Sequence, residues 1–290
     1  MKKLIPLILG RCINLLSAIA PRYAGQIGFK VFCYPFRGTL KPYHKKFLST
    51  AKTSILQHEG QRIQVYQWGS GAKKIVFFHG WQSHSYRWKN YIEQFPANEY
   101  TLYALDAPGH GLSTGSFLTV PLYSVVIEKL LLQLGEVEAV ISHSLGAFTI
   151  LYTLSRLPLL PVKKTILLAP PGEATEFFNF YRTTLRLNDR SVRHIVNHFE
   201  EVISKKVDFF SASKFAATIT QPGLIIHDED DDETSHLHSV AIHKSWTNSK
   251  LIITKGRGHN LKAPEILKEI VNFIGTNNTL EERYANSIIP

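Results

Sequence analysis

The sequence predicts an α/β fold, in which short buried strands alternate with helices around a sheet. One observation is the stretch 139–148, which reads A-V-I-S-H-S-L-G-A-F: a short apolar strand, a sharp turn and the start of a helix. A second is a series of similar apolar runs, each ending in small or polar residues, at 53–58, 61–68, 74–78, 100–105, 165–169, 223–227 and 251–254. The third is helical periodicity at 86–95, 120–134 and 264–274.

Length and charge narrow the classes of protein that the chain can belong to. The 290 residues are enough for one large domain with an insertion, and a net charge of +10 favours anionic surfaces or acidic ligands. The lysines and arginines are dispersed along the chain and form no nucleic-acid recognition motif, so we expect no nucleic-acid partner. The two cysteines, Cys12 and Cys33, give neither a disulfide framework nor metal-ligand spacing.

Residues 1–20 combine an M-K-K start with an apolar run, which is the pattern of a signal peptide. Arg11 and Asn14 interrupt that run, Pro21 follows the small residues where cleavage would occur, and the run is too short for a good spanning helix. We therefore expect a cytoplasmic protein with a basic amphipathic helix that packs on the domain or contacts a membrane surface. Export through residues 1–20 is the alternative. Residues 1–52 as a whole are expected to form a helical arm.

The stretch around Ser144 has the pattern of a nucleophile elbow, Ser142-His143-Ser144-Leu145-Gly146. Such a turn lifts the serine Oγ clear of the sheet, and the following helix start offers free backbone N–H groups. Ser142 stands where the usual motif has glycine, so its backbone must avoid a positive φ. An ordinary strand–turn–helix junction of another α/β protein is the alternative interpretation.

Two loops that follow earlier strands belong to the same predicted edge of the sheet. The strand at 74–78 ends in His79-Gly80-Trp81, and the N–H of Trp81 is predicted to hold an acyl oxyanion together with the N–H of Leu145. His79 is expected to brace the loop and not to transfer protons. Asp106 and His110, in the glycine-rich loop after 100–105, are expected to brace it as well.

These motifs together resemble the α/β-hydrolase superfamily. They are His79-Gly80, Asp106-x-Pro-Gly-His-Gly-x-Ser113, Ser142-x-Ser144-x-Gly146 and a late Gly258-His259, in the order that the superfamily has them, and the resemblance covers about residues 53–275. It implies a mostly parallel eight-stranded sheet flanked by helices, with a small helical lid. The core is then expected in two parts, 53–170 and 222–276, with a loose tail at 277–290.

The lid that the resemblance implies falls at residues 171–221, where the strand pattern stops and aromatic residues are frequent. Phe177, Phe178 and Tyr181, together with Trp81, are predicted to line an apolar substrate pocket from which a closed lid excludes water. The alternative is a plain helical layer in which these rings are core residues.

The triad acid that the resemblance implies lies in the acidic run 228–233, which reads D-E-D-D-D-E. The superfamily places this acid three residues beyond a glycine whose position Asp228 occupies here, which indicates Asp231, with Asp230 as the alternative. A calcium or magnesium loop is the rival interpretation of the run, but the alternating ligand spacing and the glycine of such a loop are missing.

The base that the resemblance implies is His259, which follows the last predicted strand. The chain has 13 histidines, so residue type alone decides nothing, and the position after that strand singles out this one. A triad of Ser144, Asp231 and His259 would act through an acyl-enzyme.

The predicted function is therefore that of a serine hydrolase, of the carboxylesterase or lipase kind, acting on a small apolar ester or acyl substrate. No metal and no organic cofactor is expected. A thioesterase, an amidase or a carbon–carbon hydrolase with the same triad remains open, as does a non-catalytic binding protein that has kept the fold. The sequence leaves the oligomeric state undetermined.

Overall fold

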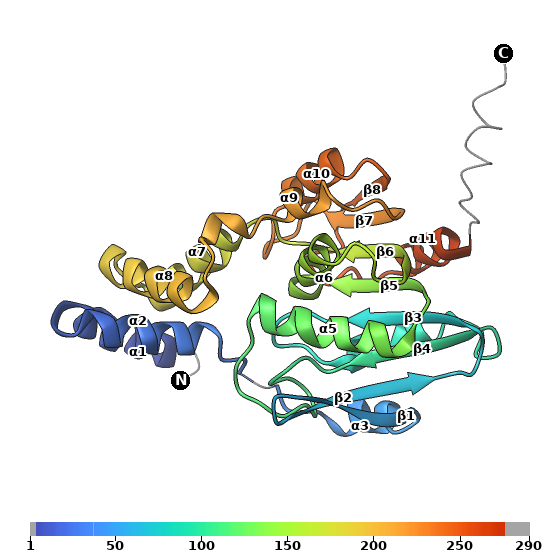
Figure 1. The fold of residues 1–290 in the computed structure, drawn as a ribbon, viewed down its shortest axis with the longest axis horizontal. Coiled ribbons are helices and arrows are strands. Elements are labelled where there is room, and N and C mark those ends of the chain that lie inside the picture. The colour runs from blue at the N-terminus through green and yellow to red at the C-terminus, as the bar shows by residue number, and fades with distance from the viewer. Residues whose placement is uncertain (1–3, 37, 276–290) are drawn as a thin grey trace, which may run out of the picture.

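The computed structural model describes residues 4–36 and 38–275, so the predicted tail at 277–290 lies outside the described residues. Eight strands form one sheet in the order β1-β2-β4-β3-β5-β6-β7-β8 (Figure 1). The strands are β1 (Lys52–His58), β2 (Gln61–Trp68), β3 (Lys73–Phe78), β4 (Tyr100–Leu105), β5 (Val137–His143), β6 (Val162–Leu168), β7 (Gly223–Asp228) and β8 (Ser249–Thr254). Strand β2 is antiparallel to β1 and β4, and the strands from β4 to β8 are parallel, which confirms the predicted fold class.

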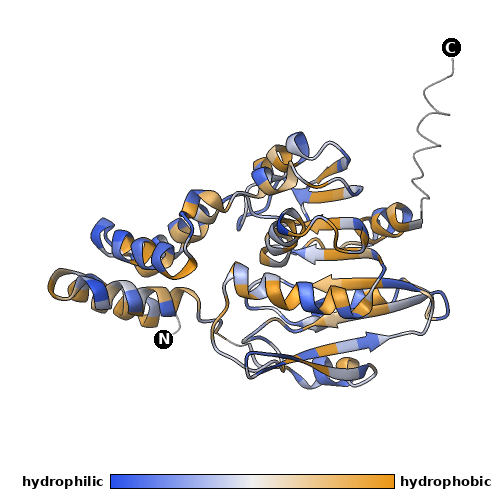
Figure 2. Cartoon of the chain, viewed as in Figure 1, coloured by the Kyte–Doolittle hydropathy of each residue, from blue (hydrophilic) through white to orange (hydrophobic). Residues whose placement is uncertain are grey.

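Side chains of the central strands are buried on both faces of the sheet, as parallel strands between helices require. In β3, Val76 and Phe78 join the core under α5 (Val120–Leu134) and α6 (Leu145–Arg156), whereas Ile75 and Phe77 join the core under α11 (Pro264–Gly275). Figure 2 accordingly shows largely apolar residues along these strands. Helix α10 (His236–Ser245) completes the first layer through Ile242.

The helix predicted at 86–95 is shorter in the structure. A 3₁₀ turn, η1 (Ser85–Trp88), leads into a single α-turn, α4 (Lys89–Ile92). Pro96 gives the physical reason, because a proline disfavours helical backbone at the residue before it and offers no N–H to continue the ladder.

The segment between β6 and β7 is helical, with α7 (Ala174–Leu185), α8 (Asp189–Ile203), η2 (Val207–Phe209) and α9 (Ala212–Ala216). The N-terminal residues form α1 (Leu4–Ile19), α2 (Pro21–Phe32) and α3 (Pro42–Leu48). Helix α2 packs along α8, and α1 contacts both α7 and α8. We call α1, α2, α7 and α8 the four-helix layer; it lies on the side of the molecule toward which the arrows of β3 and β5 point (Figure 1).

Close backbone contacts and one amide side chain hold the four-helix layer together. A Cβ at Gly25 would lie 2.5 Å from the carbonyl oxygen of His194, so α2 and α8 can approach this closely only because the residue is glycine. The Asn14 amide of α1 donates to the carbonyl of Arg186 at 3.0 Å and accepts from the N–H of Asn188 at 3.0 Å. It also accepts from the Ser191 hydroxyl at 2.8 Å. Helix α1 is therefore an integral part of the fold. Within residues 4–36 and 38–275, no helix is long and apolar enough to cross a membrane.

Candidate active site

Ser144 lies at the junction of β5 and α6 in a backbone conformation that side chains rarely adopt, with φ 51° and ψ −122°. Such strain persists only where the surrounding structure enforces it, and it is common at catalytic positions. The N–H of Ser144 donates to the carbonyl of Leu168 at 2.9 Å, which fastens the turn to β6. Ser142 has no positive φ, as predicted, and its hydroxyl donates to the carbonyl of Ile166 at 3.1 Å.

Two glycines allow the elbow to pack against the end of β3. A Cβ at Gly146 would lie 2.5 Å from the carbonyl oxygen of Phe78, so only glycine allows α6 to begin directly above that strand. A Cβ at Gly80 would lie 2.9 Å from the Cβ of Ser144. The loop that carries Trp81 therefore starts in contact with the proposed nucleophile.

Two buried histidines brace this loop. His79 accepts from the N–H of Ala107 at 2.9 Å and donates to the carbonyl of Gly80 at 2.7 Å. His110 accepts from the N–H of Gln82 at 3.0 Å, at the residue after Trp81. Burial lowers the pKa of His79 well below its usual value, and the neighbouring His110 lowers it further, so the ring stays neutral. The expected bracing role of both histidines is confirmed.

Asp106 is fully buried and is also a bracing residue, as expected. Its carboxylate accepts from the N–H and the hydroxyl of Ser85 at 2.8 and 2.7 Å, from the Tyr66 hydroxyl at 3.1 Å and from the N–H of Leu112 at 2.9 Å. These bonds join the loops after β3 and β4. They also occupy both carboxylate oxygens, which leaves the Asp106 side chain unable to orient a catalytic histidine.

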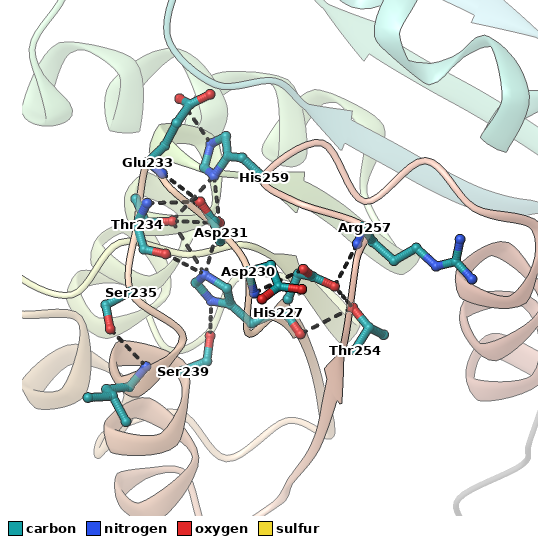
Figure 3. A network of polar contacts seen from close by, with 12 residues as sticks. His227, Asp230, Asp231, Glu233, Thr234, Ser235, Ser239, Thr254, Arg257 and His259 are labelled. Carbon is teal, nitrogen blue, oxygen red and sulfur yellow. Dashed lines mark hydrogen bonds and ion pairs between the residues drawn. The ribbon is translucent and has the colours of Figure 1, made fainter.

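The Asp231 carboxylate lies between the imidazole of His227 in β7 and that of His259 in the loop after β8 (Figure 3). Its Oδ2 is 2.8 Å from Nδ1 of His259 and 3.1 Å from Nε2 of His227. Its Oδ1 accepts from the N–H groups of Glu233 and Thr234 at 2.8 and 3.0 Å. The side chain is 0% exposed, so every contact is made away from solvent.

Hydrogen bonding explains why this buried carboxylate stays ionised. Burial alone would raise the pKa of Asp231, but the hydrogen bonds from His227 and His259 and from the N–H groups of Thr234 and Glu233 outweigh it. They hold the pKa of Asp231 well below its usual value. A negative charge therefore faces Nδ1 of His259 at neutral pH.

Asp230 points elsewhere. Its carboxylate is exposed and accepts from the N–H of Gly256 at 3.1 Å, in the loop between β8 and α11. Neighbouring residues of a turn direct their side chains differently, and here the turn brings Asp231 and not Asp230 to His259. The catalytic role of Asp231 stays a prediction.

His259 is 8% exposed, and contacts surround its ring. Nε2 lies 3.6 Å from the Glu233 carboxylate. His143, which precedes the nucleophile, donates from Nε2 to the backbone carbonyl of His259 at 2.8 Å, and the centroids of the two rings are 4.8 Å apart. Among the described residues, no hydrogen bond joins Ser144 Oγ to His259. Catalysis would require Nε2 of His259 to leave Glu233 and form a hydrogen bond with Ser144 Oγ. Catalytic hydrogen bonds often shorten in this way only when substrate binds.

Three residues around the Asp231–His259 pair were not anticipated from the sequence. They are His227, Glu233 and Thr234. His227 ends a predicted strand next to the acidic run, which is the one signal that could have indicated it. The contacts of Glu233 and Thr234 depend on the geometry of the turn, and the sequence does not specify that geometry.

The predicted pocket residues occupy three different environments. Phe177 packs edge-on against Phe148 of α6, with ring centroids 5.6 Å apart. Phe178 is buried and stacks on Phe32 of α2, and the Tyr181 hydroxyl donates to a carbonyl of α2 at 2.9 Å. The Trp81 ring contacts His110, with centroids 5.5 Å apart. Phe178 and Tyr181 thus belong to the packing of the four-helix layer, and the pocket itself stays a prediction.

Comparison with known proteins agrees with this fold. Residues 75–266 match the model of the alpha/beta hydrolase family, so the chain belongs to that family. A bifunctional esterase/perhydrolase of Acinetobacter calcoaceticus is 26% identical, over 76% of this chain and 98% of that protein.

Solved structures are similar at the level of the fold. An esterase of a Rhodococcus species is 16% identical, with a TM-score of 0.60, over 78% of this chain and 98% of that one. The Est1E protein of Butyrivibrio proteoclasticus, solved with ferulic acid, is 18% identical, with a TM-score of 0.59, over 76% of this chain and 96% of that one.

Proposed function

We propose that this protein is a serine hydrolase that cleaves a carboxylic ester with an apolar acyl part. Ser144 is the nucleophile, His259 the general base and Asp231 the residue that orients the imidazole. The observation that carries the proposal is the 2.8 Å contact between Asp231 Oδ2 and His259 Nδ1. Asp231 follows β7, and His259 follows the neighbouring strand β8. The strained backbone of Ser144 and the esterase/perhydrolase among the relatives support it.

Acylation begins when Ser144 Oγ attacks the carbonyl carbon of the ester. Nε2 of His259 takes the hydroxyl proton, while Asp231 fixes the tautomer and stabilises the imidazolium that forms. The negative oxygen of the tetrahedral intermediate accepts hydrogen bonds from the N–H groups of Trp81 and Leu145. The intermediate collapses to an acyl ester on Ser144, and the alcohol leaves with the proton from His259.

Deacylation repeats the same steps with water. His259 removes a proton from the water as its oxygen attacks the acyl carbon, and the oxyanion again forms at Trp81 and Leu145. The bond from the acyl carbon to Ser144 Oγ breaks, Oγ regains a proton from His259, and the carboxylic acid is released. All groups required for both half-reactions come from the chain itself.

The apolar acyl part is inferred from the surroundings of the nucleophile. Phe148 lies one helical turn after Ser144 on α6, and Phe177 packs against it from α7. Phe148 is fully buried, whereas the ring of Phe177 that packs against it is partly exposed. An acyl chain that reaches from Ser144 to Phe177 would replace water against this partly exposed ring.

The test is hydrolysis of a 4-nitrophenyl acyl ester by Ser144→Ala. The variant should lose several powers of ten in kcat and keep the melting temperature of the parent protein. Ser142→Ala is the matched control: the serine lies two residues away in the same elbow, and its hydroxyl is occupied by the Ile166 carbonyl. Its kcat should stay within a few fold. Equal activity of Ser144→Ala and the parent would contradict the proposal.

A further inference from the structure

Helix α1 is apolar on the side that faces away from the protein. Gly10, Ile13 and Ser17 are buried in the four-helix layer. The opposite side carries large apolar residues with exposed fractions of 51% to 82%: Leu4, Ile5, Ile8, Leu15 and Ile19. With 3.6 residues per turn, Leu4, Ile8, Leu15 and Ile19 align along one stripe of the helix. A helix that is apolar all round is normally covered on both sides.

The neighbouring helix α8 shows what an ordinary outer face in this layer is like. Its exposed residues include Arg190, Arg193, Asn197 and Glu201, and its apolar residues Ile195 and Phe199 point inward. Among the large apolar residues, α8 exposes Val202 and α7 exposes Phe180, whereas α1 exposes five along one side, and α2 adds Tyr23 and Ile27, which are 65% and 42% exposed. Contiguous exposed apolar surface of this kind marks an interaction site.

Helices α1 and α2 contain basic residues and no acidic residue, whereas Lys45, Lys46 and Lys52 of the same N-terminal segment lie on α3 and β1 (Figure 1). The first acidic residue in the sequence is Glu59, and residues 1–58 contain 10 lysines and arginines. Residues 59–290 contain 23 basic and 23 acidic residues, so the whole net charge of +10 belongs to the N-terminal segment. On α1 and α2 the side chains of Arg11, Arg22 and Lys30 are exposed near the apolar stripe. Apolar side chains with cations beside them fit an anionic lipid surface.

We propose that the outer face of α1, continued by Tyr23 and Ile27 of α2, docks on a bilayer that contains anionic phospholipid. Helix α1 lies along the surface: its 16 residues span about 24 Å, which is shorter than the hydrocarbon core of a bilayer. The apolar side chains enter the boundary between headgroups and acyl chains, and the exposed arginines and lysines contact phosphate groups. The contacts of Asn14 with α8 keep the helix attached to the domain during docking.

The position of the four-helix layer implies a consequence of membrane docking for catalysis. This consequence rests on the proposed function. The layer lies on the side to which β3 and β5 point (Figure 1), and Ser144 follows the end of β5. The helices that would contact the bilayer are then on the same side of the molecule as the proposed nucleophile. Lipid-soluble esters would be supplied from the membrane on that side.

The experiment measures sedimentation of the full-length protein with large vesicles of phosphatidylcholine, with and without about 30 mol% phosphatidylglycerol. The test variant is Leu15→Gln/Ile19→Gln, two residues that are 72% and 82% exposed and whose replacement leaves the core intact. Leu132→Gln/Leu159→Gln is the matched control, because these residues are 59% and 95% exposed but lie outside the four-helix layer. The parent and the control should bind anionic vesicles, and the test variant should bind them at least about tenfold more weakly than the parent.

Several outcomes would overturn the proposal. The parent protein could stay in the supernatant with anionic vesicles, it could bind equally to vesicles without phosphatidylglycerol, or the test variant could bind as the parent does. A concentration-dependent dimer in gel filtration, lost in the test variant and without vesicle binding, would show that a second copy covers the face. Hydrolysis of a water-soluble short-chain ester should be the same in all three proteins. Its absence from all three would contradict the proposed function and leave the vesicle result standing.

Discussion

Asp231 Oδ2 lies 2.8 Å from Nδ1 of His259. The same oxygen lies 3.1 Å from Nε2 of His227, whose Nδ1 is 2.6 Å from the Ser239 hydroxyl of α10. The carboxylate is thus held between His227 of β7 and His259 of the loop that follows β8. This arrangement limits the freedom of His259 before any substrate arrives.

Replacing Asp231 by asparagine should cost orders of magnitude in kcat on an activated ester, because an amide favours the wrong imidazole tautomer at His259. Asp230→Asn is the matched control and should cost little, since Asp230 bonds to the N–H of Gly256 and not to the imidazole. The measurement is kcat of both variants at neutral pH. Activity lost in Asp230→Asn and kept in Asp231→Asn would show that the acid has been assigned one residue too late.

Glu233→Gln should raise kcat on a small ester by up to about fivefold. The Glu233 carboxylate is 3.6 Å from Nε2 of His259, the nitrogen that must receive the Ser144 proton, and its side chain is 64% exposed. An exposed carboxylate interacts with a neighbouring side chain by up to about 1 kcal/mol, which sets the upper limit of the gain. Asp232→Asn, an exposed neighbour, is the control and should leave kcat unchanged. A drop in kcat for Glu233→Gln would mean that this carboxylate assists the reaction.

Phe177→Ala should weaken turnover of long acyl chains more than that of acetyl esters, because Phe177 covers Phe148 one helical turn beyond Ser144. Tyr181→Phe should instead lower stability by about 1 kcal/mol through loss of the hydrogen bond to the Gly28 carbonyl, with no change in chain-length preference. The comparison requires kcat/KM over a series of 4-nitrophenyl esters. A uniform effect of Phe177→Ala across the series would assign that ring to the core.

His143 should make the protein less stable in mild acid. Burial lowers the pKa of His143 well below its usual value, and the charges of Arg87 and His259 lower it further. A group whose pKa is lowered on folding stabilises the fold above its unfolded pKa of about 6.5 and loses that contribution as the pH falls below it.

The unfolding free energy of the parent should therefore fall more between pH 7.5 and 5.5 than that of His143→Gln, by about 1.4 kcal/mol. Urea unfolding of both proteins at pH 7.5 and pH 5.5 measures this difference in unfolding free energy. His58→Gln is a suitable control, since His58 is a buried histidine of β1 at the far edge of the sheet. Parallel pH dependence in the parent and His143→Gln would show that folding leaves the pKa of His143 unchanged, which would contradict this prediction.

The core of the fold was accessible from sequence because local patterns specify it, and the relation of Asp231 to His259 was accessible through the resemblance to the α/β-hydrolase superfamily. Apolar runs give the strands, Gly146 and Gly80 are required by close backbone contacts, and the register after His227 indicates Asp231 rather than Asp230. The pairing of α1 and α2 with α7 and α8 was not accessible, because it joins segments far apart in the chain. Asn14 bonds to Ser191, and no local pattern relates the two residues. The approach of Glu233 to His259 is likewise a matter of turn geometry.

The most direct test of the central claim is labelling of the native protein with a fluorophosphonate, followed by mass-spectrometric mapping of the modified residue. The account predicts one phosphonylated serine, Ser144, with labelling abolished in Ser144→Ala and strongly slowed in His259→Gln, because the nucleophile depends on that base. Ser142→Ala should be labelled as the parent is. A label on another serine, or equal labelling of Ser144→Ala and the parent, would contradict the assignment of Ser144 as the nucleophile.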